Sequence, residues 1–262
     1  MSRVRPPAVA GMFYPGNPAV LQRTVDELLA TAAAPAAEQP KALIVPHAGY
    51  IYSGSTAARG YAALAPWRDT IRRVVLLGPT HRVAVAGLAL TEADALATPL
   101  GTVAVDTAAV AEIADLPQVV ASDRVHAQEH SLEVHLPFLQ VALRDFQLVP
   151  LVVGDATAAE VAQVLERLWG GPETLIVVSS DLSHYHDYAT ARRLDRETSR
   201  FIQDLSPVPL HGEQACGCRP VSGLLQAARD HGLQARLLDL RSSGDTAGPR
   251  DRVVGYGAYA FA

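Results

Sequence analysis

The chain has 262 residues, of which 49% are hydrophobic and 19% charged, and its formal net charge is −5. This length can bury a large core, and we expect a single domain over residues 1–262. The absence of a basic stripe argues against nucleic acid as a partner. With no apolar run near the ~18 residues of a membrane span and no signal-peptide pattern, we expect a cytoplasmic protein with no membrane partner.

Short apolar runs and amphipathic segments alternate along most of the chain. Asn17 is a suitable N-cap for a helix that begins at Pro18 and continues to about residue 33. Further helices are predicted over residues 55–64, 107–114, 131–144, 156–168, 188–205 and 220–230, and strands over 41–45, 73–77, 83–90, 98–105, 146–153, 174–178, 235–240 and 253–261. Pro137 should kink or split its helix. The alternation predicts an α/β fold, with three αβα layers around a mainly parallel or mixed central sheet.

Three of the predicted strands end in a turn that carries a histidine. His47 follows the strand over 41–45, His81 follows the strand over 73–77, and His184 comes after the strand over 174–178. Because ligands in open α/β sheets bind beyond the carboxyl ends of the strands, these histidines could converge on one metal or acid/base site. The alternative is a set of ordinary loop histidines that hydrogen-bond to the backbone.

Asp181 stands three residues before His184. At this spacing the two side chains would be neighbours if a helical turn begins here, and Asp181 would then orient a proton-transferring His184. Alternatively, Asp181 is a simple N-cap of the next segment.

A second polar cluster covers residues 129–135. His130 and Glu133 form a His-x-x-Glu pair at helical spacing, which is not the metalloprotease signature His-Glu-x-x-His. Glu129 and His130 could ligate a metal, support its ligands or contact a substrate at the pocket mouth. Ordinary helix-start chemistry around Ser131 and Glu133 is a further possibility.

The two cysteines form a Cys-Gly-Cys turn. A disulfide between Cys216 and Cys218 would be strained, since one residue separates them. One thiolate with two imidazoles is a suitable ligand set for zinc, iron or copper. In an extended turn the two side chains point in opposite directions, so one of them, and not both, would be the ligand. An incidental thiol is the alternative, and the spacing does not choose between the two cysteines.

Six motifs now give the chain a recognisable pattern. In order, they are Pro-Ala-Val-Ala-Gly-Met-Phe-Tyr-Pro, Pro-His-Ala-Gly-Tyr-Ile-Tyr-Ser-Gly, Gly-Pro-Thr-His, Glu-His-Ser-Leu-Glu-Val-His-Leu-Pro, Ser-Ser-Asp-Leu-Ser-His-Tyr and Cys-Gly-Cys-Arg-Pro. From about Pro7 to its C-terminus the chain resembles the Memo family, protein B of the AmmeMemoRadiSam system. The resemblance implies an αβα fold like that of the class III extradiol dioxygenases, which use non-haem Fe(II).

The resemblance also implies roles for individual residues. It assigns His47, His81 and Cys216 as ligands of a divalent metal, with Fe(II) as first choice and copper or zinc as alternatives. It assigns His184 as the acid/base residue, with Asp181 beside it. Together with the strand-end pattern, it leads us to expect a substrate pocket lined by Tyr50, Glu129, His130 and Tyr185. The dioxygenases complete their ligand set with a carboxylate, whereas a thiolate here is softer and more easily oxidised.

Three functions follow as hypotheses. The first is a dioxygenase-like, iron-dependent oxidoreductase acting on a small, possibly aromatic substrate. The second is a zinc hydrolase in which His184 serves as general base. The third is a non-enzymatic binding or adaptor protein that uses the same pocket for a peptide or an anion. The family's name also implies a pathway association with a radical SAM enzyme and an AMMECR1-like protein.

Overall fold

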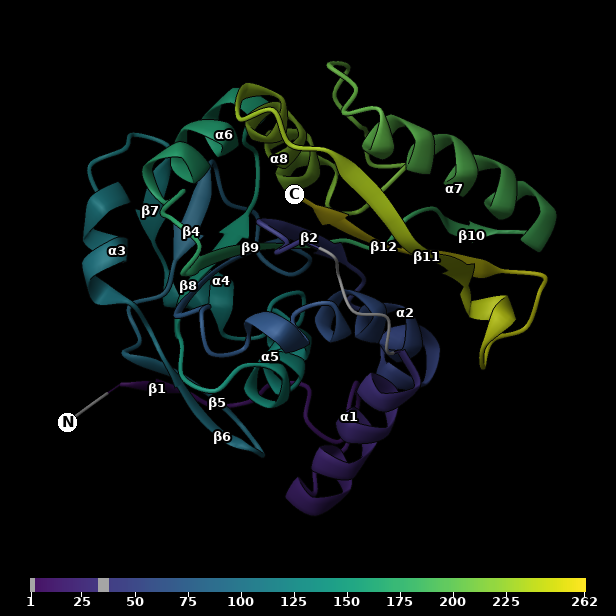
Figure 1. Cartoon of the computed structure of the whole chain (residues 1–262), viewed down its shortest axis with the longest axis horizontal. Helices are drawn as coiled ribbons and strands as arrows, with labels where there is room; N and C mark the ends of the chain where they lie inside the picture. The colour runs from purple at the N-terminus through teal and green to yellow at the C-terminus, as the bar shows by residue number, and fades with distance from the viewer. Residues whose placement is uncertain (1–2, 33–37) are drawn as a thin grey trace.

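A computed structural model describes residues 3–32 and 38–262 of the chain. It confirms the predicted α/β class: helices cover both faces of a mixed central sheet (Figure 1). Among the described residues this sheet has nine strands, and a separate sheet of three strands lies beside it. None of the described helices is long and apolar enough to cross a membrane.

Four parallel strands form the centre of the large sheet. They are adjacent in the order β2 (Ala42–Val45), β9 (Thr174–Ser179), β3 (Arg73–Pro79) and β8 (Gln147–Val153). Nearly all their residues are buried, as is typical of parallel strands covered on both faces. Since the strands are parallel and adjacent, the carboxyl ends of β2, β9 and β3 meet at one edge of the sheet. This edge carries the candidate site.

Further strands extend the sheet on both sides, and all of them pair antiparallel with their neighbour except β7, which pairs with β4 in parallel. On one side lie β12 (Val253–Phe261), β11 (Ala235–Ser242) and β10 (His184–His186), and on the other lie β4 (Leu88–Leu90) and β7 (Val119–Ala121). The small sheet contains β1 (Val4–Arg5), β5 (Ala95–Thr98) and β6 (Gly101–Ala104).

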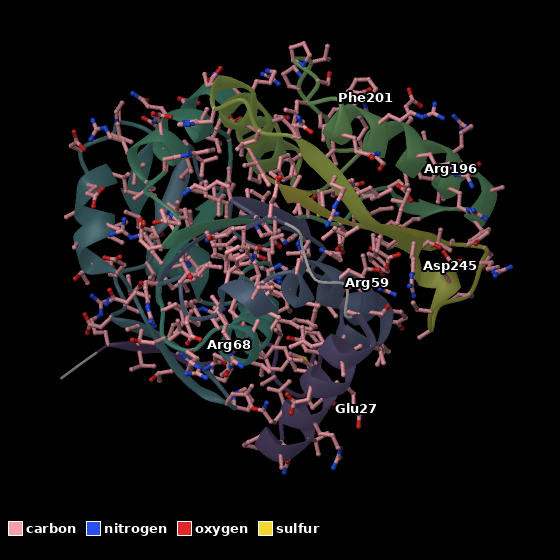
Figure 2. All side chains as sticks on the ribbon, in the orientation of Figure 1. Glu27, Arg59, Arg68, Arg196, Phe201 and Asp245 are labelled. Carbon is pink, nitrogen blue, oxygen red and sulfur yellow. The ribbon has the colours of Figure 1, made fainter. Side chains whose placement is uncertain are left out.

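The helices divide between the two faces of the sheet. The helices α1 (Pro18–Ala32), α2 (Tyr50–Ala62) and α5 (Leu136–Ala142) pack on one face, and α3 (Thr107–Ile113), α6 (Ala158–Arg167) and α8 (Cys218–Asp230) pack on the other. A longer helix, α7 (Tyr188–Gln203), packs against β11 and β12, and α4 (Asp123–His126) is a short helix near β4. Exposed charged side chains, such as Glu27 on α1 and Arg196 on α7, lie on the outer surface of these helices (Figure 2).

The side chains of each central strand alternate between two hydrophobic cores. In β9, Leu175 and Val177 belong to the core under α1, α2 and α5, whereas Ile176 and Val178 belong to the core under α6 and α8. This alternation follows from the two-residue period of a strand. Apolar and polar residues do not alternate along these strands because both faces are buried.

Several element boundaries differ from those predicted. The strand expected over 83–90 is confined to β4, since Gly87 just before it adopts a positive φ of 78°. The segment over 131–144 is split, as expected from Pro137: a short 3-10 turn over Glu133–His135 precedes α5, and Pro137 occupies the first turn of α5. Strand β10 was not predicted at all. The last residue of the first predicted helix, residue 33, lies outside the described residues.

Candidate metal centre

The sheet edge brings together three of the predicted metal-ligating side chains. His47 follows β2, His81 follows β3, and Cys216 precedes α8. The candidate ligand atoms of these three residues all lie within 4.8 Å of one another. His47 Nε2 is 3.4 Å from Cys216 Sγ, a separation that suits two ligands of one metal ion at the usual bond lengths of about 2.0–2.3 Å.

A buried serine determines which nitrogen of His47 carries the proton. Ser179 Oγ donates its single hydrogen to the carbonyl oxygen of Ser131, at 2.6 Å. His47 Nδ1 lies 2.6 Å and His135 Nε2 lies 2.8 Å from the same hydroxyl oxygen, so both nitrogens must donate to it. His47 therefore keeps its proton on Nδ1 and presents the Nε2 lone pair to the site.

The same network continues behind His135. Because His135 Nε2 donates to Ser179, its Nδ1 is the acceptor for the Tyr61 hydroxyl at 2.9 Å. Burial lowers the pKa of His135 to about 3 and that of His47 well below its usual range. Both imidazoles are thus neutral near pH 7, which is the state in which a histidine binds a metal.

Glu129 performs the corresponding task for His81. Its Oε1 lies 2.9 Å from His81 Nδ1, and its carboxylate also accepts the backbone N–H groups of His81, His130 and Ser131. Burial opposes ionisation of Glu129, but these hydrogen bonds and the charge of His81 lower its pKa to about 2. His81 Nδ1–H therefore points at a carboxylate and His81 Nε2 is left for a metal, which is the usual arrangement of a ligating histidine.

Of the roles that we considered for Glu129, these contacts match support of a ligand rather than contact with a substrate. Glu129 is buried, and although it forms a second possible ligand group with His81 and His130, its oxygens are already occupied by N–H donors. Glu133 is also committed elsewhere: it accepts hydrogen bonds from Arg5 and Tyr14, at 2.7 and 2.6 Å. It anchors the N-terminal arm and does not pair with His130 as a metal ligand.

The cysteines have different surroundings. Cys216 Sγ accepts the N–H of Asp181 at 3.3 Å, and burial together with the charge of Asp181 raises the pKa of the thiol. The thiol is therefore protonated in the metal-free protein. Cys218 is the first residue of α8, and its side chain packs against the core under α6 and α8. Cys216, and not Cys218, is therefore the thiol that lies next to His47.

Asp181 and His184 do not form the pair that we expected. Asp181 Oδ1 accepts the backbone N–H of His47 at 2.8 Å, and burial raises the pKa of Asp181 to about 7. His184 lies in strand β10, not in a helical turn, and its Nδ1 is 2.8 Å from the carbonyl oxygen of Leu182. That carbonyl fixes the proton on Nδ1, so the Nε2 of neutral His184 is a proton acceptor.

A pocket of about 410 Å³ opens beside the candidate ligands. His47, His81, His130, Asp181 and His184 contribute polar groups to its wall, and Phe13, Tyr52, Tyr185 and Tyr256 contribute aromatic rings. Tyr185 has a positive φ of 63° and is 64% exposed, and the Arg252 guanidinium lies 5.0 Å from its ring centre. The pocket thus combines an aromatic wall with a cluster of imidazoles.

Only some of the predicted pocket residues line this wall. His130 and Tyr185 line the pocket, whereas Tyr50 does not: its hydroxyl donates to the Val134 carbonyl at 2.6 Å and its ring packs against Phe138. Tyr52 takes that position because it lies two residues further along the first turn of α2. Ser179 could have been found by its place directly at the end of a strand, but Phe13 and Tyr256 lie too far away in the sequence to give such a signal.

Sequence comparisons relate the chain to one protein family. A family model described as Memo-like protein matches residues 5–260. A MEMO1 family protein of Aeropyrum pernix is 35% identical over 98% of this chain and 99% of its own length. A MEMO1 family protein of Aquifex aeolicus is 37% identical over 97% of each chain. Among solved structures, an uncharacterized Escherichia coli K12 protein aligns with a TM-score of 0.48 and 16% identity, covering 84% of this chain and 99% of that one.

Proposed function

The chain belongs to the Memo family, and from this premise we propose that it is a metal-dependent oxidoreductase that uses non-haem Fe(II) and O₂ on a small aromatic substrate. One observation carries the proposal. His47, His81 and Cys216 bring their ligand atoms within 4.8 Å of one another, and His47 and His81 also line an aromatic pocket.

The residues fit a divalent metal because their hydrogen bonds prepare them for it. Ser179 and Glu129 hold the protons of His47 and His81 on Nδ1, so both Nε2 atoms are available as ligands. Cys216 completes a set of two nitrogens and one sulfur, which leaves coordination positions open. Bound Fe(II) would supply the redox chemistry with O₂.

The remaining polar groups of the pocket suit the handling of a phenolic substrate. His184 Nε2 is the acceptor for a substrate hydroxyl proton, because its Nδ1 is committed to Leu182. Burial lowers the pKa of His184, which keeps this base neutral near pH 7. Phe13, Tyr52 and Tyr185 offer ring surfaces on which an aromatic substrate can pack.

Anaerobic purification and loading with Fe(II) test this proposal. We expect one iron per chain in the wild-type protein, and loss of iron in the His47→Ala and Cys216→Ala variants. With a panel of catechols, the wild type should consume O₂, and a His184→Gln variant should retain iron while its rate falls by about 10²–10⁴-fold. Iron at the same trace level in the wild type and in His47→Ala would overturn the proposal.

The thiol of Cys216 favours a second candidate, a zinc hydrolase. A thiolate with two imidazoles is a suitable ligand set for zinc, and a zinc-bound water would be activated for attack with His184 as base. This candidate predicts zinc that survives aerobic purification, hydrolysis of activated esters and no O₂ consumption. Retained iron with O₂ uptake would reject it.

A further inference from the structure

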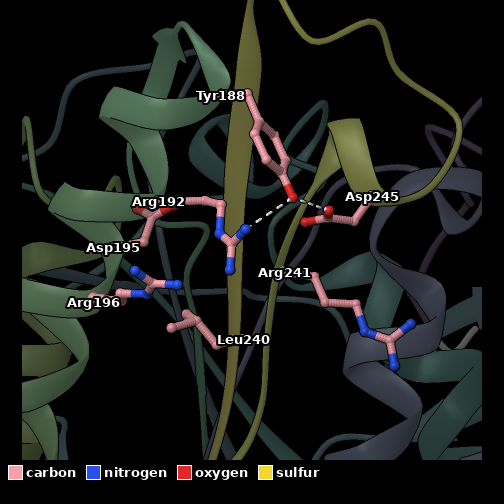
Figure 3. A pocket seen from close by; sticks show the side chains of 7 residues that line it. All are labelled: Tyr188, Arg192, Asp195, Arg196, Leu240, Arg241 and Asp245. Carbon is pink, nitrogen blue, oxygen red and sulfur yellow. Dashed lines mark hydrogen bonds between the residues drawn. The ribbon is translucent and has the colours of Figure 1, made fainter.

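A second hollow lies between α7 and β11. Its volume is about 340 Å³, and its wall includes Tyr188, Arg192 and Arg196 from α7 and Arg241 from β11 (Figure 3). None of these residues lines the pocket beside the candidate metal ligands. Pockets that bind small molecules in proteins begin at about 300 Å³, so the hollow has room for a small metabolite.

Two arginines of this hollow lack a carboxylate partner. Arg192 and Arg196 lie four residues apart on the same face of α7, and neither forms an ion pair with any residue that the structure describes. Like charges at this spacing destabilise a helix. By contrast, Arg241 is paired with Asp239 at 2.9 Å. Figure 3 shows the guanidinium groups of Arg192 and Arg196 directed into the same space.

The surrounding residues hold this arrangement in place. The Tyr188 hydroxyl donates to Asp245 Oδ1, and the guanidinium groups of Arg192 and Arg250 lie 5.4 and 4.5 Å from the Tyr188 ring centre. At the back of the hollow, Asp195 is only 3% exposed and accepts the N–H of Ser183 at 3.0 Å. Arg192 and Arg196 are themselves exposed, and the carboxylates of Asp195 and Asp245 also line the hollow, so its wall carries three guanidinium groups and two carboxylates.

We propose that this hollow binds a small phosphorylated metabolite, with Arg192 and Arg196 holding its phosphate group. Guanidinium groups present planar pairs of N–H donors that match phosphate oxygens, and a dianion would offset the repulsion between the two arginines. The proposal does not depend on the identity of the metal.

Calorimetric titration of the full chain with ribose 5-phosphate and with inorganic phosphate tests this site. The protein is first freed of metal with a chelator that is then removed, because phosphate also binds metal ions. We expect ribose 5-phosphate to bind at physiological salt with one site per chain. The Arg192→Gln/Arg196→Gln double variant should bind at least about tenfold more weakly. Arg193→Gln is the matched control, since Arg193 is exposed on the same helix but does not line the hollow.

Each outcome decides the proposal. The proposal is supported if the double variant loses binding and Arg193→Gln does not. Equal weakening by Arg193→Gln would mean that only the general charge of α7 attracts the anion, and the proposal would then be wrong. Absence of binding by both probes at millimolar concentration would also overturn it. Circular dichroism of all variants separates a lost site from a lost fold.

Discussion

Ser179 Oγ lies 2.6 Å from His47 Nδ1, and this contact sets the proton position of the first candidate ligand. In a Ser179→Ala variant, His47 loses its acceptor and its proton is free to move to Nε2. We expect the affinity for Fe(II) or zinc to fall by about 10–100-fold, the usual effect of removing such a supporting contact. Competition with a chromophoric chelator measures this affinity.

Ser55→Ala provides the matched control for that experiment. The Ser55 hydroxyl is buried in α2 without a hydrogen-bond partner among the described residues. Its removal should leave metal affinity unchanged. If Ser179→Ala binds metal as tightly as Ser55→Ala, the hydrogen bond to Ser179 does not contribute to metal binding by His47.

Metal affinity should fall in steps as the charge and then the hydrogen-bond acceptor of Glu129 are removed. A Glu129→Gln variant retains an oxygen acceptor near His81 Nδ1 but loses the negative charge, whereas Glu129→Ala loses both. We expect a modest loss of metal affinity in the first variant and about a 10–100-fold loss in the second. Wild-type affinity in both variants would show that neither the charge nor the acceptor supports His81.

Metal binding should release one proton near pH 8. Burial raises the pKa of the Cys216 thiol, so the thiol is still protonated at this pH, whereas Asp181, with a pKa of about 7, is mostly ionised. A metal ion must displace the thiol proton in order to bind sulfur. Calorimetry in buffers of different ionisation enthalpy counts the released protons. Cys216→Ala should reduce the count to near zero, and an unchanged count would remove Cys216 from the ligand set.

His126 should contribute to the loss of stability in acid. It is buried, its Nε2 lies 2.8 Å from the Ala89 carbonyl oxygen, and burial lowers its pKa to about 4. The unfolded chain therefore binds one more proton between about pH 6.5 and pH 4, and stability falls as the pH falls through this range. The contribution is ~1.4 kcal/mol per pH unit.

Urea unfolding at several pH values tests the role of His126. A His126→Gln variant can still donate to Ala89 but does not titrate, so its free energy of unfolding should fall less steeply between pH 6.5 and pH 4. Parallel curves for the two proteins would contradict the assignment.

The layered fold and the main site were accessible from the sequence for a physical reason. Buried parallel strands read as continuous apolar runs, and adjacent strands of this kind bring their carboxyl ends to one edge. His47 and His81 come directly after such runs, so their convergence could be expected. Strand β10 was missed because its three residues, His184–His186, lack any apolar pattern and form a strand only by pairing with β12.

The order of residues alone was enough to establish the α/β class, the strand-end histidines and, through the motifs, the family. The task of each polar group became visible only in the folded chain. Ser179 hydrogen-bonds to both His47 and His135, and Glu129 hydrogen-bonds to His81. Asp181 accepts the backbone N–H of His47 and does not orient His184. These roles depend on hydrogen bonds between residues far apart in the chain, whose distances and directions are set by packing and leave no periodic signal in the sequence.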